Sequence, residues 1–364
     1  MGSTVDVVVV GAGLSGLLVA RELHQAGLTV AVFDEREPGK AASWAGGGIL
    51  SPLQPWRAPE AIQQLVMWSQ SRYEVLIAEL RERTGIDAQY TRSGLLILDQ
   101  CVTPQIMSWA RRFAVVVEAV DAAAAAALLH RDSCDGPEGV LFPQVGQLRN
   151  PRLLRALLSD LSQRGVTVAA HTPVVELVVG KGRISGVRTS VGEVGAGVVV
   201  VTAGAWSGEL LRPLGIKVPV FPVRGQMLLI RAEPGLVQPV VLRGSRYLVP
   251  RRDGHVLVGS TVERTGFDGS VTEAARRLLA QFACETVPSL GRYPIVKHWA
   301  GLRPGSPQGI PMIGAHPQVR GLYLNTGHFR NGVVMAPAAA RLTADLILER
   351  PPIVAAQPYA LQGR

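Results

Sequence analysis

The chain opens with a continuous apolar run, a helical pattern and a second apolar run. Residues 5–10 are typical of a buried strand, and residues 17–23 are typical of a helix. Gly27 ends that helix, and residues 28–33 predict a second strand. The opening therefore predicts a β-α-β unit, the building block of a doubly wound sheet.

The middle of the chain continues to alternate between the hydrophobic patterns of helices and of strands. Residues 59–84 predict a long amphipathic helix, and residues 94–98 predict a strand. Another helix is predicted from Asn150, its expected cap, to Arg164. Residues 180–186 resemble a second glycine loop, but an extended segment follows them. They therefore predict a β-hairpin rather than a second dinucleotide site.

The pattern changes at residues 218–258, where short apolar strands are separated by turns. This arrangement predicts an antiparallel sheet, and hence a second layer of structure. Helices are predicted again at residues 272–287 and 332–348, and the alanine run at 122–127 is expected on a helix surface. The fold class expected is α/β, a Rossmann-like doubly wound domain plus an α+β domain with a large, mostly antiparallel sheet.

Length, charge and cysteine content narrow the class of protein. A chain of 364 residues is long enough for two packed domains. The net charge of +9 comes from dispersed Lys and Arg residues without a basic run, which argues against nucleic-acid binding. No apolar run reaches the roughly 20 residues of a membrane span, and the valine-rich start is interpreted as a strand rather than a secretory signal. The scattered Cys101, Cys134 and Cys284 predict neither a metal site nor a disulfide framework, as expected of a cytoplasmic protein.

The most informative motif is the glycine turn between the first strand and helix. Gly11 permits the tight turn, Gly13 lets the backbone approach a pyrophosphate, and Gly16 lets the helix pack close to the strand. A carboxylate at the end of the second strand can bind ribose hydroxyls. The alternative is that the glycines serve packing alone. The residues expected at the cofactor are Gly11, Ala12, Gly13, Leu14, Ser15, Gly16, Asp34 and Glu35.

Several further motifs, taken in order, resemble the D-amino-acid-oxidase-like family of flavoproteins, and most closely its glycine oxidase branch. They include S-W-A-G-G-G-I, A-G-A-W-S-G, V-R-G-Q-M, Y-L-V-P-R, W-A-G-L-R-P-G and G-H-F-R-N-G. The resemblance implies FAD rather than NAD and two discontinuous domains. The FAD-binding domain is expected at residues 1–85, 140–215 and 300–364, and the substrate-binding domain at residues 86–139 and 216–299.

The resemblance also implies roles for individual residues. Arg303 is expected to hold a substrate carboxylate, Tyr247 to hydrogen-bond substrate, and Arg330 to lie at the same site. By pattern alone, Arg303 could instead bridge domains, Tyr247 could be a packing residue, and His328 could be a base or a packing residue. The other residues expected at FAD are Ala42, Ser43, Gly47, Gly48, Ile49, Val174, Ala203, Gly204, Trp206, His328, Phe329, Arg330, Asn331, Gly332, Val333 and Val334.

The implied activity is oxidation of glycine or N-substituted glycines, with hydride transfer from Cα to the flavin giving an imine. Molecular oxygen, reduced to hydrogen peroxide, is the expected acceptor, although a quinone would fit equally well, and a homo-oligomer is compatible with the sequence. The alternatives are a D-amino-acid dehydrogenase or oxidase of broader specificity and a non-catalytic FAD-binding subunit. Relatives that tether FAD use a C-terminal cysteine, and none occurs between Arg303 and Arg341, so non-covalent FAD is expected. Val262 stands where glycine oxidases can place a larger methionine beside the substrate.

Overall fold

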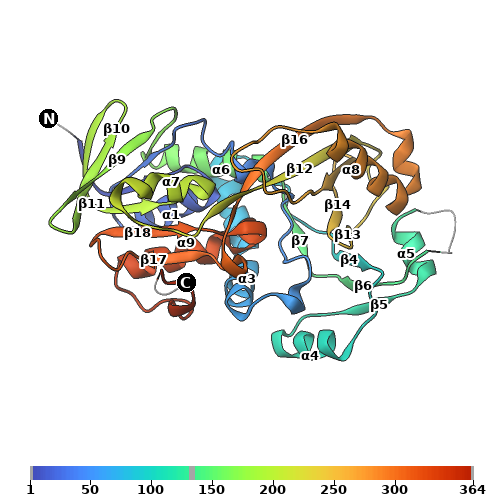
Figure 1. Ribbon diagram of the computed structural model, residues 1–364. Helices are drawn as coiled ribbons and strands as arrows, with labels where there is room; N and C mark the ends of the chain where they lie inside the picture. Colours follow the sequence, from blue (N-terminus) through green and yellow to red (C-terminus); the bar gives the residue numbers. More distant parts are fainter. Residues whose placement is uncertain (1–2, 131–135, 362–364) are drawn as a thin grey trace.

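The computed structural model describes residues 3–130 and 136–361, which form two eight-stranded sheets seen as two lobes in Figure 1. The strands of the first sheet are β1 (Ser3–Val10), β2 (Val30–Phe33), β8 (Thr167–Ala169), β9 (Val174–Gly180), β10 (Arg183–Thr189), β11 (Gly192–Val201), β17 (Met312–Ala315) and β18 (Leu322–Thr326). β1 lies parallel to both β2 and β11, and β18 is parallel to β11. This arrangement confirms the predicted doubly wound domain.

Helices cover one face of the first sheet. Val7 and Val9 of β1 are buried against the helices, whereas Val8 and Val10 face the opposite way, toward the β9–β10 hairpin. That antiparallel hairpin confirms the interpretation of residues 180–186. The helices of the covered face are α1 (Leu14–Gln25), α3 (Glu60–Thr84), α6 (Asn150–Gln163) and α9 (Gly332–Ile347), and α7 (Ser207–Leu211) lies on the other side.

The second sheet is antiparallel except where β13 pairs with β4. Helix α8 (Glu273–Thr286) packs on one face of this sheet, and α4 (Pro104–Phe113) and α5 (Ala122–Leu128) lie at its far edge (Figure 1). The expected domain boundaries near residues 140 and 300 fall inside two of its strands. The strands are β4 (Leu95–Leu98), β5 (Glu118–Val120), β6 (Gly139–Phe142), β12 (Phe221–Arg231), β13 (Val240–Arg243), β14 (Arg246–Pro250), β15 (His255–Gly259) and β16 (Ile295–Gly305).

The segment before the glycines at 46–48 forms a one-turn helix, α2 (Ala42–Ala45). Two local predictions differ from the structure. Asn150 is the first residue of α6 rather than its cap, because its side chain bonds elsewhere. Ala125 and Ala126 are buried, so one side of the alanine run in α5 packs into the core of the second domain instead of lying on the surface.

A buried carboxylate joins three helices of the first domain. Asp160 of α6 is fully buried and accepts hydrogen bonds from Arg21 of α1 (3.0 Å), Arg83 of α3 (2.8 Å) and Arg164 (2.9 Å). Burial alone would raise the pKa of this carboxyl, but bonds to Arg164 and Arg83 and the charge of Arg21 keep the pKa below its ordinary value. Asp160 therefore stays ionised and holds α1, α3 and α6 together.

Candidate functional site

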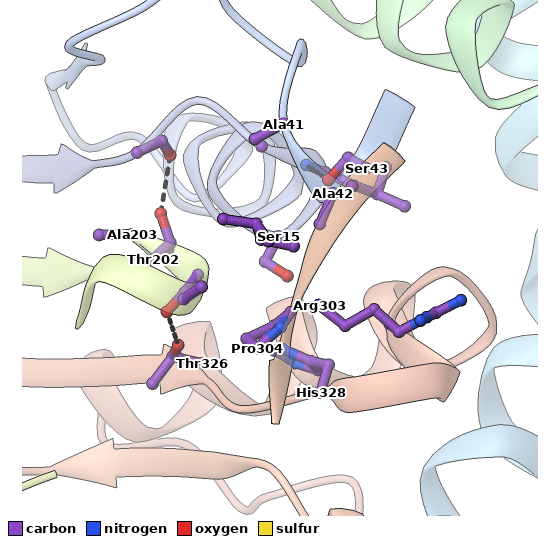
Figure 2. A pocket seen from close by; sticks show the side chains of 18 of the residues that line it. Ser15, Ala41, Ala42, Ser43, Thr202, Ala203, Arg303, Pro304, Thr326 and His328 are labelled. Atoms are coloured by element: carbon purple, nitrogen blue, oxygen red, sulfur yellow. Dashed lines mark hydrogen bonds between the residues drawn. The ribbon is translucent and has the colours of Figure 1, made fainter. Parts of the chain in front are cut away.

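A cavity of about 470 Å³ lies between the two sheets. The first domain contributes the glycine turn and the end of β2, and the second contributes residues of β12, β14 and β16. Figure 2 shows Ser15, Ser43 and His328 gathered around this space with Arg303 and Pro304. A cavity between two domains is a common place for cofactor and substrate to meet.

The three glycines of the turn are required for different reasons. Gly11 has φ +107°, and a Cβ there would lie 2.7 Å from the carbonyl oxygen of Thr202. A Cβ on Gly16 would lie 1.9 Å from the carbonyl oxygen of Gly11. A Cβ on Gly13 would meet only the Ser43 hydroxyl at 3.2 Å, and it borders the cavity. Gly11 and Gly16 therefore serve the fold, whereas Gly13 leaves room for a ligand such as a pyrophosphate.

Asp34 is fixed at the end of β2 beside this turn. Its Oδ2 accepts the N–H of Ala12 at 2.7 Å, and its Oδ1 accepts the N–H of Arg36 at 2.9 Å. Asp34 and Glu35 both line the cavity. Because a carboxylate has about four acceptor positions, Asp34 retains capacity for ribose hydroxyls. The glycine turn and this carboxylate together fit an adenine dinucleotide.

Ser43 and Asn150 organise the opposite wall. The Ser43 hydroxyl accepts the N–H of Leu14 at the start of α1 (2.9 Å), and the Asn150 amide donates to the Ser43 carbonyl (2.8 Å). A Cβ on Gly48 would lie 2.0 Å from the carbonyl oxygen of Leu148, so the segment just before α6 packs directly against the loop that contains Gly48. The amide of Asn150 therefore holds α2 against α6, which is why it does not cap its own helix.

Most residues expected at the cofactor line this one cavity. Ala12, Gly16 and Val334 do not, since they are buried behind the wall. The start of α9 reaches the cavity through its N-cap Asn331, which places the positive end of the helix dipole there. The expected residues that line it are Gly11, Gly13, Leu14, Ser15, Asp34, Glu35, Ala42, Ser43, Gly47, Gly48, Ile49, Val174, Ala203, Gly204, Trp206, His328, Phe329, Arg330, Asn331, Gly332 and Val333.

Arg303, Arg330 and Tyr247 come together at the end formed by the second sheet. Arg303 donates to the Ser260 hydroxyl (2.6 Å) and to the Thr261 carbonyl (3.1 Å). Burial, followed by the nearby charge of Arg303, lowers the pKa of Arg330. Among the described residues, no carboxylate forms an ion pair with either arginine. Two neighbouring guanidinium groups without a carboxylate partner are chemically suited to bind a carboxylate ligand.

His328 lies at the same cavity but is otherwise enclosed by protein. Burial lowers the pKa of His328 to about 4, so the imidazole is neutral at pH 7. Its Nε2 has no hydrogen-bond partner in the part of the chain that the structure describes. Its Cβ is also the nearest neighbour, at 3.3 Å, of a Cβ built on Gly332. His328 therefore contributes a neutral side chain, packed beside the start of α9.

Other lining residues were not anticipated from the sequence. Gly225 and Met227 face the cavity from β12, and Ser260 follows β15. The alternation of a strand, applied to V-R-G-Q-M, could have found the first two. Arg36 stacks over Trp206 with its guanidinium carbon 4.3 Å from the ring centroid. Val262 does not line the cavity, and its side chain is exposed, so the structure gives it no place beside a substrate.

The described residues contain no cluster of His, Cys, Asp and Glu able to hold a metal ion. Cys101 and Cys284 are free and exposed, while Cys134 lies outside the described residues. No helix in residues 3–130 or 136–361 has the length and apolar character to cross a membrane.

Comparison with known proteins agrees with this geometry. Residues 6–346 match the family model described as FAD dependent oxidoreductase (DAO). A glycine oxidase from Pseudomonas aeruginosa is 46% identical over 359 residues, covering 98% of this chain and 99% of the relative.

Two solved structures extend this likeness to the fold. The glycine oxidase of Geobacillus kaustophilus superposes with a TM-score of 0.92 at 28% identity, covering 100% of this chain and 99% of the other. An iminodiacetate oxidase from Chelativorans superposes with a TM-score of 0.89 at 27% identity, covering 97% and 98%. The match over nearly the whole chain and the dinucleotide cradle agree, and the chain belongs to the DAO family of FAD-dependent oxidoreductases.

Proposed function

We propose that this protein is an FAD-dependent oxidase of glycine or of N-substituted glycines. The observation that carries the proposal is the pair Arg303 and Arg330 beside Tyr247, facing the same cavity as the dinucleotide cradle. A guanidinium pairs bidentately with a carboxylate and keeps its charge, so it holds an amino acid in one pose. The glycine oxidase and the iminodiacetate oxidase named above support this substrate class.

Each side chain then has a defined role. Arg303, held by Ser260 and Thr261, binds the carboxylate, and Arg330 adds a second positive charge. Tyr247 offers its hydroxyl, whose only recorded partner within the described protein is the weak acceptor Sδ of Met227 at 3.6 Å. FAD, when bound non-covalently, supplies the hydride acceptor. The protein contributes orientation and electrostatics, which can account for much of the acceleration of such a reaction.

The acidic residues that line the cavity decide whether a protein group can accept the proton of the substrate amine. Asp34, Glu35 and Glu209 all come from the first domain, and His328 is neutral. No carboxylate from the second sheet lines the cavity, so the described residues place no strong base at the arginine pair. The substrate amine therefore reacts in its neutral form, having lost its proton to solvent. Molecular oxygen is the proposed acceptor of the electrons, and the imine product hydrolyses after release.

Anaerobic mixing of the FAD-loaded protein with a panel of amines tests the proposal. The panel is glycine, sarcosine, N-ethylglycine, iminodiacetate and D-alanine, and the measurement is bleaching of the flavin absorbance. Fastest bleaching by glycine or one of its N-substituted forms is expected. Fastest bleaching by D-alanine would favour a D-amino-acid oxidase, and absence of bleaching by every amine would favour a non-catalytic FAD-binding subunit. Admitting oxygen or a quinone to the bleached protein then identifies the acceptor.

A further inference from the structure

The guanidinium of Arg251 crosses from the second domain to the loop that forms the cavity wall. Arg251 follows β14, and its Nη2 donates to the carbonyl oxygen of Gly47 at 2.9 Å. Its Nη1 donates to the carbonyl oxygen of Leu148 (2.8 Å) and to Oε1 of Gln147 (2.7 Å). Arg251 does not itself line the cavity, whereas Gly47 does. The motif Y-L-V-P-R thus contributes a second residue to the site besides its tyrosine.

The charge of Arg251 is not neutralised by an ion pair. All three acceptors are uncharged oxygens, and no described carboxylate lies within ion-pair distance of the side chain. The nearest acid in sequence, Asp253, is instead bonded to Arg149 at 2.7 Å. Burial and, to a smaller extent, Arg149 lower the pKa of Arg251 to about 10, so the side chain remains protonated at pH 7. A partly buried positive charge therefore lies directly behind the wall of the cavity.

The contact with Gly47 also sets the direction of one peptide unit. In a trans peptide the C=O and the following N–H point in opposite directions. Because the Gly47 carbonyl points at Arg251, the N–H of Gly48 points away from Arg251. The Gly48 carbonyl accepts the N–H of Leu148 at 2.9 Å, which holds the other side of the same loop. A Cβ on Gly47 would lie 3.1 Å from the ring of Tyr247, so this peptide adjoins Tyr247, which lines the same cavity as the arginine pair.

We propose that Arg251 is a positioning residue for the flavin: it turns the N–H of Gly48 toward the cavity and adds a positive charge behind it. This inference rests on FAD occupying the cavity, as in the proposed function. Fixed donors and positive charge aimed at a group that gains negative charge stabilise its reduced form. Arg251 therefore raises the reduction potential of the bound flavin, and it strengthens binding of anions that add to the flavin.

Three variants of the full-length protein test this role. R251M removes the charge and all three bonds, R251K keeps the charge on a group without the planar fork, and R252M is the control. Arg252 is the next residue, but it is half-exposed and bonded to Asp87 at 3.0 Å, away from the cavity loop. The measurements are FAD content, the midpoint potential of the flavin, and the dissociation constant for sulfite, an anion that adds to oxidised flavins.

R251M is expected to have a more negative potential and about tenfold weaker sulfite binding, typical of the loss of one charged hydrogen bond. R251K should have intermediate values, and R252M should match the wild type. Unchanged potential and sulfite affinity in R251M would overturn the proposal. If R251M does not fold, the comparison of R251K with the wild type decides in the same way, since identical values would overturn it. Absence of FAD from the wild type would contradict the proposed function instead.

Discussion

The guanidinium of Arg303 occupies the space that a side chain at residue 225 would need. A Cβ built on Gly225 would lie 2.1 Å from Nη1 and 2.2 Å from Nη2 of Arg303. Gly225 of β12 pairs in register with Gly301 of β16, so two glycines leave this part of the sheet without side chains. The arginine therefore lies flat against the sheet, and its pose depends on a residue with no functional group.

Gly225→Ala should displace Arg303 without removing it. The methyl group cannot coexist with the observed guanidinium position, so carboxylate binding should weaken by roughly tenfold to a hundredfold, part of the cost of breaking a charged pair. FAD content should stay normal. The measurement is the dissociation constant of a substrate carboxylate, with Gly269→Ala as the control because a Cβ there meets nothing within 4 Å. An unchanged dissociation constant would show that Arg303 does not grip the carboxylate in this pose.

Arg303→Ala should remove the charged pair outright. Truncation of one partner of such a pair typically costs about 2–5 kcal/mol, or roughly 30-fold to several-thousand-fold in binding. Arg303→Lys should restore only part of the loss, since an ammonium cannot reproduce the planar fork. Steady-state kinetics with glycine and with an amine lacking a carboxylate make the comparison. An equal loss for both amines would assign the carboxylate to another residue, with Arg330 the next candidate.

Much of the fold could be predicted because its signals are local. The strand, glycine turn, helix and acid at residues 5–34 each follow from a short pattern, and so does the β9–β10 hairpin. The start of α6 could not be predicted in this way. Asparagine is a common helix cap, but the amide of Asn150 bonds to the carbonyl of Ser43, more than a hundred residues away in sequence. A local rule fails there because a tertiary contact uses the same side chain.

The residues of the candidate site also divide into those that a sequence motif identifies and those that depend on tertiary contacts. Arg303 and Tyr247 can be assigned only through a family resemblance, since a single arginine or a strand tyrosine is ordinary by pattern. Gly225 and Arg251 were not anticipated, because their roles depend on which atoms two distant segments bring together. Arg251 looks like one of many arginines in the sequence until its three acceptors are known. Residues that act because they lack a side chain, or because they position a neighbouring group, are the hardest to identify from a single sequence.

Gly13 and Gly16 should separate cofactor binding from folding. A Cβ on residue 13 would come close only to the Ser43 hydroxyl, so the Gly13→Val variant should still fold. Its side chain should instead block the space for the pyrophosphate. Gly16→Ala should instead destabilise the fold, because its Cβ would lie 1.9 Å from a backbone carbonyl oxygen. Far-ultraviolet circular dichroism with urea, and FAD absorbance after gel filtration, distinguish the two results. A yellow, fully loaded Gly13→Val protein would contradict the dinucleotide interpretation of the turn.

Asp160→Asn should destabilise the first domain. Removing this charge leaves the buried Arg21 with only the half-exposed Glu79 as a carboxylate partner, and breaking a buried pair typically costs about 3–5 kcal/mol. The pKa of Asp160 is lowered in the folded state, so its contribution is fully present above the unfolded pKa near 4 and is lost as pH falls further. Urea unfolding at pH 7 and at pH 3 measures both effects, with exposed Glu82→Gln on α3 as the control. A wild-type-like midpoint at pH 7 would show that the cluster is not stabilising.

Asn331→Asp should lower the reduction potential of the flavin. Asn331 is the N-cap of α9 and lines the cavity, so an added carboxylate there opposes the positive end of the helix dipole and repels charge on the reduced cofactor. Aspartate is a favourable N-cap, so the melting temperature should not fall, and misfolding cannot then explain a changed potential. Asn331→Ser is the matched variant, since it changes the side chain at the same position without adding a charge. Spectroscopic redox titration should give a more negative midpoint for the aspartate variant and a wild-type value for the serine variant. An unchanged or raised midpoint with aspartate would mean that the start of α9 lies away from the redox-active ring.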